Sequence, residues 1–162
     1  MAYWLIKSEP EECGLTHFIA ASDQGIPWDG VRNYQARNFI RAMRPGDRVL
    51  LYHSSCQRVG IAGELRVISE PYPDPLQFDP DSRYFDAKAT RVVPRWTAID
   101  LVLASALSRL VPLMELKRMK AFKSSPLVKK GNRLSVMPLT REQWLAVEKI
   151  ASVGSALLPV SR

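Results

Sequence analysis

The sequence predicts an α+β fold built around a small β-barrel, and three observations lead to this class. Short runs of β-branched and aromatic residues alternate with short helical patterns, and brief loops join them. The 12 prolines and 8 glycines favour many short elements with stiff turns over a long helical bundle. Gly60 and Gly63 interrupt one strand pattern, as a curved barrel strand requires. We therefore expect about five to six mixed strands with flanking helices, in a single domain spanning residues 1–162.

Two helices and three strands are expected in the N-terminal half. Thr16 can cap a short helix over residues 17–21, and apolar residues at helical spacing predict an amphipathic helix over residues 33–43. Between these helices, a loop over residues 23–27 is expected to place Trp28 beside a turn. Strands are expected where β-branched and aromatic residues gather, over residues 3–6, 49–52 and 59–68.

A proline-rich loop over residues 71–81 opens the C-terminal half, and an extended pattern follows over residues 84–93. Residues 99–110 are ambiguous, because their leucines and valine favour a strand whereas their alanines tolerate a helix; we expect a strand. The remaining elements are a helix over residues 112–119, a strand over 133–137, and a helix over 140–150 that begins with a capping box.

Positive charge gathers in the C-terminal half of the chain. The net charge is +7, of which residues 1–80 contribute −2 and residues 81–162 contribute +9. The run from Lys117 to Arg133 holds seven Lys and Arg residues and no Asp or Glu. Such a basic face favours a polyanionic partner, although a solvated surface loop gives the same pattern.

What the sequence lacks disfavours several classes of protein. No apolar run approaches the roughly 20 residues that span a bilayer, and the glutamates near the N-terminus are unlike a signal peptide. We expect a cytoplasmic protein with no membrane partner. Cys13 and Cys56 are too few for a disulfide framework or a four-thiolate zinc site, and His17 and His53 add no paired metal motif. Phosphate-loop, dinucleotide and nucleophile-elbow motifs are missing, so we expect no cofactor, no metal and no enzyme activity.

Aromatic and polar side chains recur together at the ends of the expected strands. Aromatic faces stack on a base, amide and hydroxyl groups bind its edge, and basic groups hold the flanking phosphates. Taken singly, each ring is more often a core residue and each polar group more often caps a turn. Their joint occurrence nevertheless indicates a site for a flat ligand. The set comprises Lys7, Ser8, Trp28, Asp29, Arg32, Asn33, Tyr34, Tyr52, His53, Ser54, Trp96 and Arg133.

Long segments of the chain resemble the EVE domain family. The matching residues are Tyr3 to Pro10, Trp28 to Asn38, Tyr52 to Ser54, Gly60 to Gly63, Tyr72 to Asp74, Pro94 to Trp96, Pro112 to Lys117 and Arg133 to Thr140. The resemblance implies a PUA-like barrel, akin to the YTH readers of methylated adenine. The Ile-Lys-Ser and cage tryptophan of those readers look like Ile6-Lys7-Ser8 and Trp28 here.

The function that the resemblance implies is recognition of a modified base, such as 5-methyl- or 5-hydroxymethylcytosine, in DNA or RNA without chemical change. Trp28 is then expected to form one aromatic wall and Trp96 a second. Polar pocket contacts are expected from Lys7, Ser8 and Asn33, and Tyr52, His53 and Ser54 complete the expected pocket. Phosphate contacts are expected from Arg32, Arg37, Lys129, Lys130 and Arg133.

Two other functions stay open at this point. Related barrels of the ASCH type include ribonucleases, and an enzyme of that kind would use His53 with Lys7 or Glu9. The same pocket could instead hold a free nucleoside or a small anionic metabolite. The expected partner is nucleic acid that carries a modified base, bound by a monomer.

Overall fold

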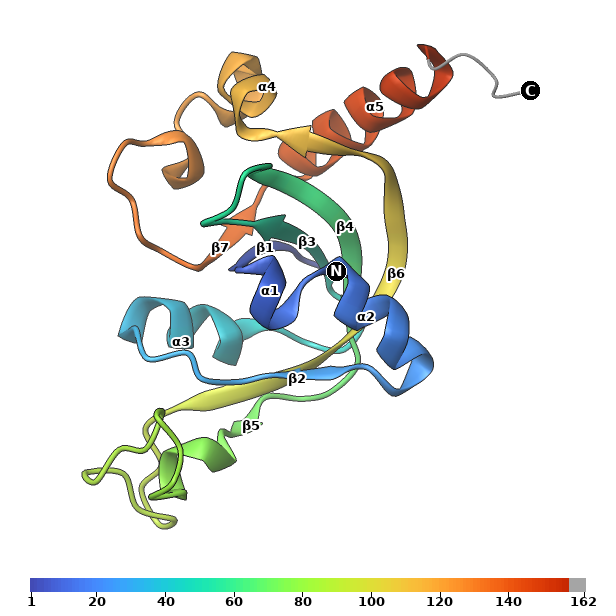
Figure 1. Cartoon of the computed structure of the whole chain (residues 1–162). Helices are drawn as coiled ribbons and strands as arrows, with labels where there is room; N and C mark the ends of the chain where they lie inside the picture. The colour runs from blue at the N-terminus through green and yellow to red at the C-terminus, as the bar shows by residue number, and fades with distance from the viewer. Residues whose placement is uncertain (158–162) are drawn as a thin grey trace.

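The computed structural model describes residues 1–157, with side chains as far as residue 152, and its core lies on a curled mixed sheet (Figure 1). Strand β1 (Tyr3–Ser8) runs through this core, where Leu5 and Ile6 are fully buried. It pairs in parallel with β3 (Arg48–His53) and antiparallel with β7 (Val136–Leu139). Because both edges of β1 are paired, the side chains at its end are held in fixed positions.

The remaining strands extend the sheet and curl it. Their order is β2-β6-β4-β3-β1-β7, and β5 pairs with β6 off this path. Strand β6 (Thr97–Pro112) is 16 residues long and pairs with β2 (Ile26–Trp28), β4 (Gly60–Val67) and β5 (Tyr72–Pro73). Irregular register between β4 and β6 increases the local twist, which lets one long strand pair with several shorter ones.

Four short helices and one long helix, α5, flank the sheet within the described residues. The α-helices are α1 (Pro10–Cys13), α2 (Leu15–Ala21), α3 (Tyr34–Ala42), α4 (Leu113–Arg118) and α5 (Arg141–Leu157). Single 3-10 turns occur at η1 (Ser22–Gln24), η2 (Pro75–Phe78), η3 (Lys120–Phe122) and η4 (Pro126–Val128). None of the helices within residues 1–157 combines the length and apolar content needed to cross a bilayer.

The α+β class and most of the expected elements are confirmed. The ambiguous residues 99–110 lie within strand β6, and the expected capping box opens α5, where the Gln143 amide donates to Thr140 Oγ1 at 3.0 Å. The expected helix over 33–43 is α3, and the Asn33 side chain caps it by accepting a hydrogen bond from the Ala36 amide at 2.9 Å.

Other expectations need correction. The extended pattern over residues 84–93 is wrong, because this segment makes local turns in which the Asp86 amide donates to the Gln77 carbonyl and the Ala89 amide to the Asp86 carbonyl. Helix α2 begins at Leu15 with Gly14 as its N-cap, so Thr16 is not the cap.

Smaller boundary errors affect three further elements. The loop expected over residues 23–27 contains the start of β2, and the loop expected over 71–81 contains β5 and η2. The last strand covers 136–139 in place of 133–137.

The first prediction concerns Gly60, where β4 passes close to β6. A Cβ atom at this position would lie 2.3 Å from the Val111 carbonyl oxygen, which belongs to the strand backbone. We expect Gly60→Ala to lower the free energy of unfolding by about 2 kcal/mol, measured by urea denaturation.

Gly63→Ala is the matched control in the same strand. Its nearest contact would be the flexible Leu15 side chain at 3.0 Å, which can move. Equal losses of stability in the two variants would contradict the assignment of a close backbone approach at Gly60.

Candidate functional site

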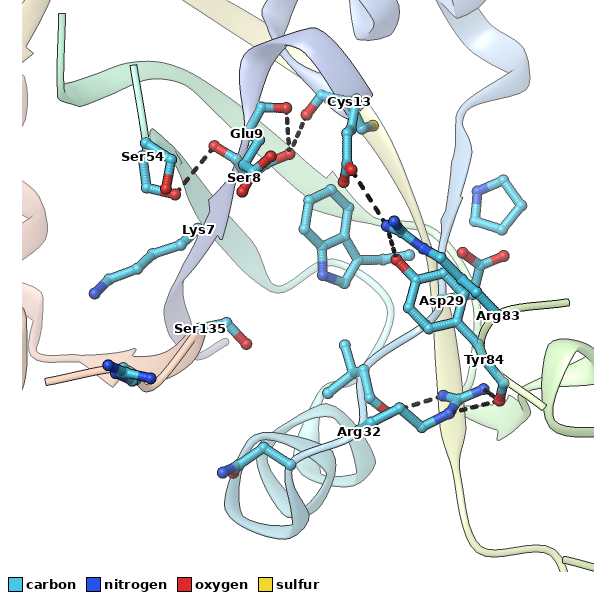
Figure 2. A pocket seen from close by; sticks show the side chains of 18 of the residues that line it. Lys7, Ser8, Glu9, Cys13, Asp29, Arg32, Ser54, Arg83, Tyr84 and Ser135 are labelled. Atoms are coloured by element: carbon cyan, nitrogen blue, oxygen red, sulfur yellow. Dashed lines mark hydrogen bonds and ion pairs between the residues drawn. The ribbon is translucent and has the colours of Figure 1, made fainter. Parts of the chain in front are cut away.

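A cavity of about 700 Å³ opens where the parallel strands β1 and β3 end (Figure 2). Its walls come from several separate parts of the chain: the end of β1 with α1, the segment from β2 to α3, the turn after β3, the loop before β6 and the turn before β7. Both charged and aromatic side chains line it. The cavity is therefore assembled by the fold and belongs to no single motif.

Lys7 and Ser8 enter this cavity from the last two positions of β1. The Lys7 amide donates to the Ser135 carbonyl at 2.8 Å, and the Ser8 carbonyl accepts from the Ser54 amide at 2.8 Å. The Lys7 ammonium lies 5.8 Å from the centre of the Tyr52 ring, and burial lowers its pKa. No carboxylate within residues 1–157 forms an ion pair with Lys7. An anionic or carbonyl group in the cavity would therefore be stabilised beside Lys7.

Trp28 forms an aromatic wall whose position is fixed from behind. The Phe18 ring of α2, only 1% exposed, stacks on the indole with 6.4 Å between ring centres. Backbone pairing of Trp28 with Ile99 of β6 anchors the main chain. The exposed part of the indole faces the cavity, so a flat ligand could stack there without a rearrangement of the wall.

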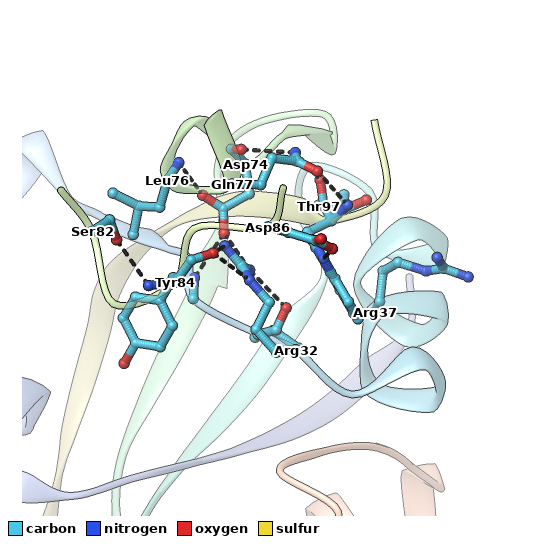
Figure 3. A network of polar contacts seen from close by, with 12 residues as sticks. Arg32, Arg37, Asp74, Leu76, Gln77, Ser82, Tyr84, Asp86 and Thr97 are labelled. Carbon is cyan, nitrogen blue, oxygen red and sulfur yellow. Dashed lines mark hydrogen bonds and ion pairs between the residues drawn. The ribbon is translucent and has the colours of Figure 1, made fainter. Parts of the chain in front are cut away.

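The loop that follows Trp28 is held by the fully buried carboxylate of Asp74 (Figure 3). Asp74 Oδ2 accepts hydrogen bonds from the Gly30 amide at 2.8 Å and from Arg32 Nη1 at 2.9 Å, while Oδ1 accepts from the Leu76 amide at 2.8 Å. Arg32 also donates to the Tyr84 carbonyl through Nε and Nη2. This network fixes two walls of the cavity relative to each other.

Tyr84 lines the cavity from the segment between η2 and β6, and sequence reasoning did not identify it. Gly30, with φ of +75°, lies so close to the ring that a Cβ atom there would approach Tyr84 to 2.9 Å. The neighbouring Arg83 forms an ion pair with Glu12 of α1 at 3.2 Å. Because the sequence predicts an extended stretch at Tyr84, it gives no signal that this residue lines the same cavity as Trp28 and Lys7.

Asp29 also lines the cavity and stays accessible to solvent. Partial burial and then the nearby Asp74 carboxylate raise its pKa. Within the described residues, its carboxylate accepts no hydrogen bond from the side chain or backbone of another residue. It is therefore a free acceptor on the cavity wall.

Seven of the residues that were expected to form the base pocket or to contact phosphates line this cavity. They are Lys7, Ser8, Trp28, Arg32, Asn33, Ser54 and Arg133. Arg32 is nevertheless committed to internal acceptors, and Ser8 Oγ donates to the Cys13 carbonyl. Asn33 uses its oxygen as the α3 cap, whereas its amino group has no partner among residues 1–157. Lys7, Trp28 and Asn33 thus keep groups that a ligand can use.

Three of the residues expected in the base pocket lie elsewhere. Tyr52 is buried beneath Lys7, and burial raises its pKa to about 12. His53 accepts a hydrogen bond from the Leu15 amide at Nε2, and burial lowers its pKa, so the neutral ring serves to hold the start of α2. Trp96 is 5% exposed and donates to Asp86, so it is not a wall of this cavity.

The residues expected to contact phosphates lie partly at the cavity and partly outside it. Arg133 lines the cavity, and Lys129 and Lys130 are exposed on the turn that precedes it. Arg37 lies outside the cavity and donates to the Arg95 carbonyl at 3.0 Å. Within the part of the chain that the structure describes, His, Cys, Asp and Glu side chains form no cluster able to hold a metal ion.

Comparison with known proteins decides the family. A family model described as "EVE domain" matches residues 2–150 of this chain. The chain belongs to the EVE domain family. Human thymocyte nuclear protein 1 is 38% identical over 159 residues, which cover 88% of this chain and 71% of that protein.

Solved structures show the same EVE fold. A crystal structure of a Pseudomonas syringae protein is 47% identical with a TM-score of 0.88 and covers 93% of this chain and 99% of its own. Human thymocyte nuclear protein 1 in complex with DNA containing 5-methylcytosine is 38% identical with a TM-score of 0.82, covering 93% of this chain and 98% of its own.

A more distant likeness extends the fold comparison beyond EVE domains. The YTH domain of Zygosaccharomyces rouxii MRB1, solved with N6-methyladenosine RNA, is 13% identical with a TM-score of 0.52. It covers 93% of this chain and 86% of its own. At this identity the likeness shows that the EVE fold and the YTH fold are related in architecture, which agrees with the PUA-like barrel that the sequence resemblance implied.

The second prediction tests the Asp74 network. Asp74→Asn places an amino group against the donors of Gly30 and Arg32 and leaves the Arg32 charge without its carboxylate. We expect a loss of about 2–3 kcal/mol in the free energy of unfolding, measured by urea denaturation.

Asp81→Asn removes an equal charge from an exposed position a few residues away. We expect this control to change stability by less than about 0.5 kcal/mol. If Asp74→Asn were as well tolerated as the control, the network would not be what fixes the cavity walls.

Proposed function

We propose that this EVE domain takes a modified nucleobase of DNA or RNA into the cavity beside Trp28 and binds it without chemical change. The observation that carries the proposal is the arrangement around the indole, an aromatic face supported from behind by Phe18. The Lys7 ammonium and the Asp29 carboxylate line the same cavity, and neither has an ion-pair partner among the described residues. The homologue bound to 5-methylcytosine DNA supports this class of ligand.

Stacking on the aromatic walls of the cavity can offset the free energy needed to take a base out of its stack. Taking a base out of its stack costs a few kcal/mol, and stacking on an aromatic side chain returns about 1–3 kcal/mol per base. Trp28 supplies this stacking surface and Tyr84 adds a second ring in the same cavity. A methyl group on the base adds apolar contact, which is worth about 0.8 kcal/mol per buried carbon. The proposed ligand class is therefore a base with a small added group, such as 5-methyl- or 5-hydroxymethylcytosine.

The polar groups favour a base with an exocyclic amine. A carboxylate such as Asp29 accepts a hydrogen bond from the amino group of cytosine, whereas it repels the carbonyl that thymine carries at the same position. The Lys7 ammonium and the free amino group of Asn33 donate to base or phosphate oxygens. Arg133 at the cavity, with Lys129 and Lys130 beside it in the sequence, supplies positive charge for the flanking phosphates.

The proposal includes no catalytic step. His53, the residue suspected for a ribonuclease, already accepts the Leu15 amide at Nε2, and it lines a separate hollow beside Cys56 and Arg58. Its ring therefore supports α2 and is not positioned against a substrate in the Trp28 cavity.

The third prediction removes the aromatic wall. Oligonucleotides carrying cytosine, 5-methylcytosine, 5-hydroxymethylcytosine, adenine or N6-methyladenine, each single-stranded and as a duplex, are titrated while binding is followed by fluorescence anisotropy. We expect one modified base to bind more tightly than its unmodified partner, and we expect Trp28→Ala to weaken that binding about 10-fold or more.

Trp96→Phe is the matched control, because this residue lies outside the cavity and phenylalanine keeps a ring against Tyr34. It is expected to retain the selectivity. The proposal fails if no modified base is preferred, or if both variants bind like the wild type.

The fourth prediction concerns Asp29 and compares 5-methylcytosine with thymine, two bases that share the methyl group and differ in the amine. We expect the wild type to prefer 5-methylcytosine, and Asp29→Asn to reduce this preference about 10-fold, since an amide can donate to the thymine carbonyl. Asp81→Asn provides the charge control. An unaltered ratio in Asp29→Asn would show that another group recognises the amine.

A further inference from the structure

One face of α3 carries a row of arginines that the cavity does not use. Arg37 and Arg41 are four residues apart, which places them on one side of the helix. Arg44 lies two residues beyond the end of α3, and its Nη1 donates to the Arg41 carbonyl at 2.9 Å. Arg95 from the segment before β6 joins them, because its carbonyl accepts hydrogen bonds from both Arg37 and Arg41. We call these four residues the arginine face.

Aromatic rings and polar contacts hold this face in place. Tyr34 stacks on Trp96 with 4.8 Å between ring centres, and the Arg37 guanidinium lies 4.7 Å from the centre of the Tyr34 ring. Arg95 hydrogen-bonds to the Tyr34 hydroxyl, and Arg41 Nε donates to Thr97 Oγ1 at 2.9 Å. The guanidinium groups are thus oriented before any partner arrives. Figure 3 shows Arg37 on α3 beside the polar network that contains Arg32, Asp86 and Thr97.

The positive charge of the arginine face is only partly compensated. Within the described residues, two carboxylates approach it: Asp86 lies 3.3 Å from Arg95, and the exposed Glu70 lies 4.0 Å from Arg44. Arg37 and Arg41 have no ion pair in the same part of the chain. Desolvation is the largest cause that lowers the pKa of Arg37, and repulsion from the charges of Arg41 and Arg95 lowers it further. An added anion would relieve this repulsion.

The location of the face indicates which anion. Asn33, the cap of α3, lines the cavity, and Arg32 beside it lies 5.4 Å from the Trp96 ring, so the arginine face continues directly from the cavity wall. From Arg37 to Arg41 the helix rises about 6 Å, and Arg44 lies beyond the end of the helix, so the arginines form a row that suits successive phosphates of a strand better than one isolated phosphate. The segment that carries Lys129 to Arg133 lies on the same side of the molecule as α3 (Figure 1).

We propose that the arginine face is a second nucleic-acid contact, which binds the phosphate backbone next to the base held in the cavity. This inference rests on the proposed function and extends it: the strand crosses the cavity mouth, with its phosphates held by the arginine face on one side and by Lys129, Lys130 and Arg133 on the other. Arginine suits this role because its planar donors match phosphate oxygens. The face adds affinity for any sequence, whereas the cavity supplies selectivity.

The test measures how binding depends on salt. Affinities of the wild type and of Arg41→Gln/Arg44→Gln are determined between 50 and 200 mM salt, as in a standard counterion analysis, for two oligonucleotides that differ only in one 5-methylcytosine. Loss of two phosphate contacts is expected to reduce the slope of log K against log salt by about 1.4 for a single strand or about 1.8 for a duplex. The ratio of affinities between the two oligonucleotides is expected to stay unchanged.

Two control variants complete the design. Arg66→Gln/Lys149→Gln removes the same charge on the α5 side of the molecule. Lys149 lies on α5. Arg66 of β4 lies opposite Arg48 of β3 in the sheet, and the Arg48 guanidinium packs on Trp144 of α5. We expect the salt slope of this control to differ from the wild-type slope by less than about half a phosphate contact. Arg41→Lys/Arg44→Lys keeps the charge and should restore most of the slope.

A slope that is the same in Arg41→Gln/Arg44→Gln as in the wild type would overturn the inference, as would an equal drop in the α5-side control. These results differ from a failure of the proposed function, which would appear as equal affinity of the wild type for the methylated and unmethylated oligonucleotides. A changed affinity ratio in Arg41→Gln/Arg44→Gln would also overturn the inference, because it would show that these residues act on the base.

Discussion

The buried carboxylate of Asp74 is the interaction on which the candidate site depends. A carboxylate with no exposure needs compensation, and here it receives an arginine and two backbone amides. Through Arg32 and Gly30 it ties the loop after Trp28 to the segment that carries Tyr84. Two walls from distant parts of the sequence are thereby fixed relative to each other by hydrogen bonds, and both line the cavity.

The sheet supplies the third wall by a different principle. Strand β1 is paired on both edges, so Lys7 leaves the core at a fixed point, with the Tyr52 ring beneath its ammonium. The result is a charged group that is half-buried before a ligand binds. Preorganisation of this kind reduces the ordering that binding would otherwise require. The same holds for Trp28, which Phe18 supports, and for Arg37 of α3, whose guanidinium lies over the Tyr34 and Trp96 rings.

Much of this architecture could be predicted from the sequence, because strands, caps and helical spacing are local signals. The strand over residues 3–6, the helix over 33–43 and the Thr140 capping box all match elements of the structure. The resemblance to EVE domains pointed to Lys7 and Trp28, and both line the cavity. Local signals failed where contacts between residues distant in the sequence determine the structure. Tyr84 lies in a turn-rich segment that is held by Gln77 and, through Arg32, by Asp74. Trp96 is buried with its indole nitrogen donating to Asp86, and His53 lines a separate hollow with Nε2 accepting from the Leu15 amide.

A crystal structure of this protein with a short duplex that contains a single 5-methylcytosine tests the central claim most directly. The account predicts that the modified base leaves the helix and stacks on Trp28, with its amine at Asp29 and the neighbouring phosphates at Arg133 and the arginine face. A complex in which the base stays stacked in the duplex while the cavity holds no part of the nucleic acid would contradict it.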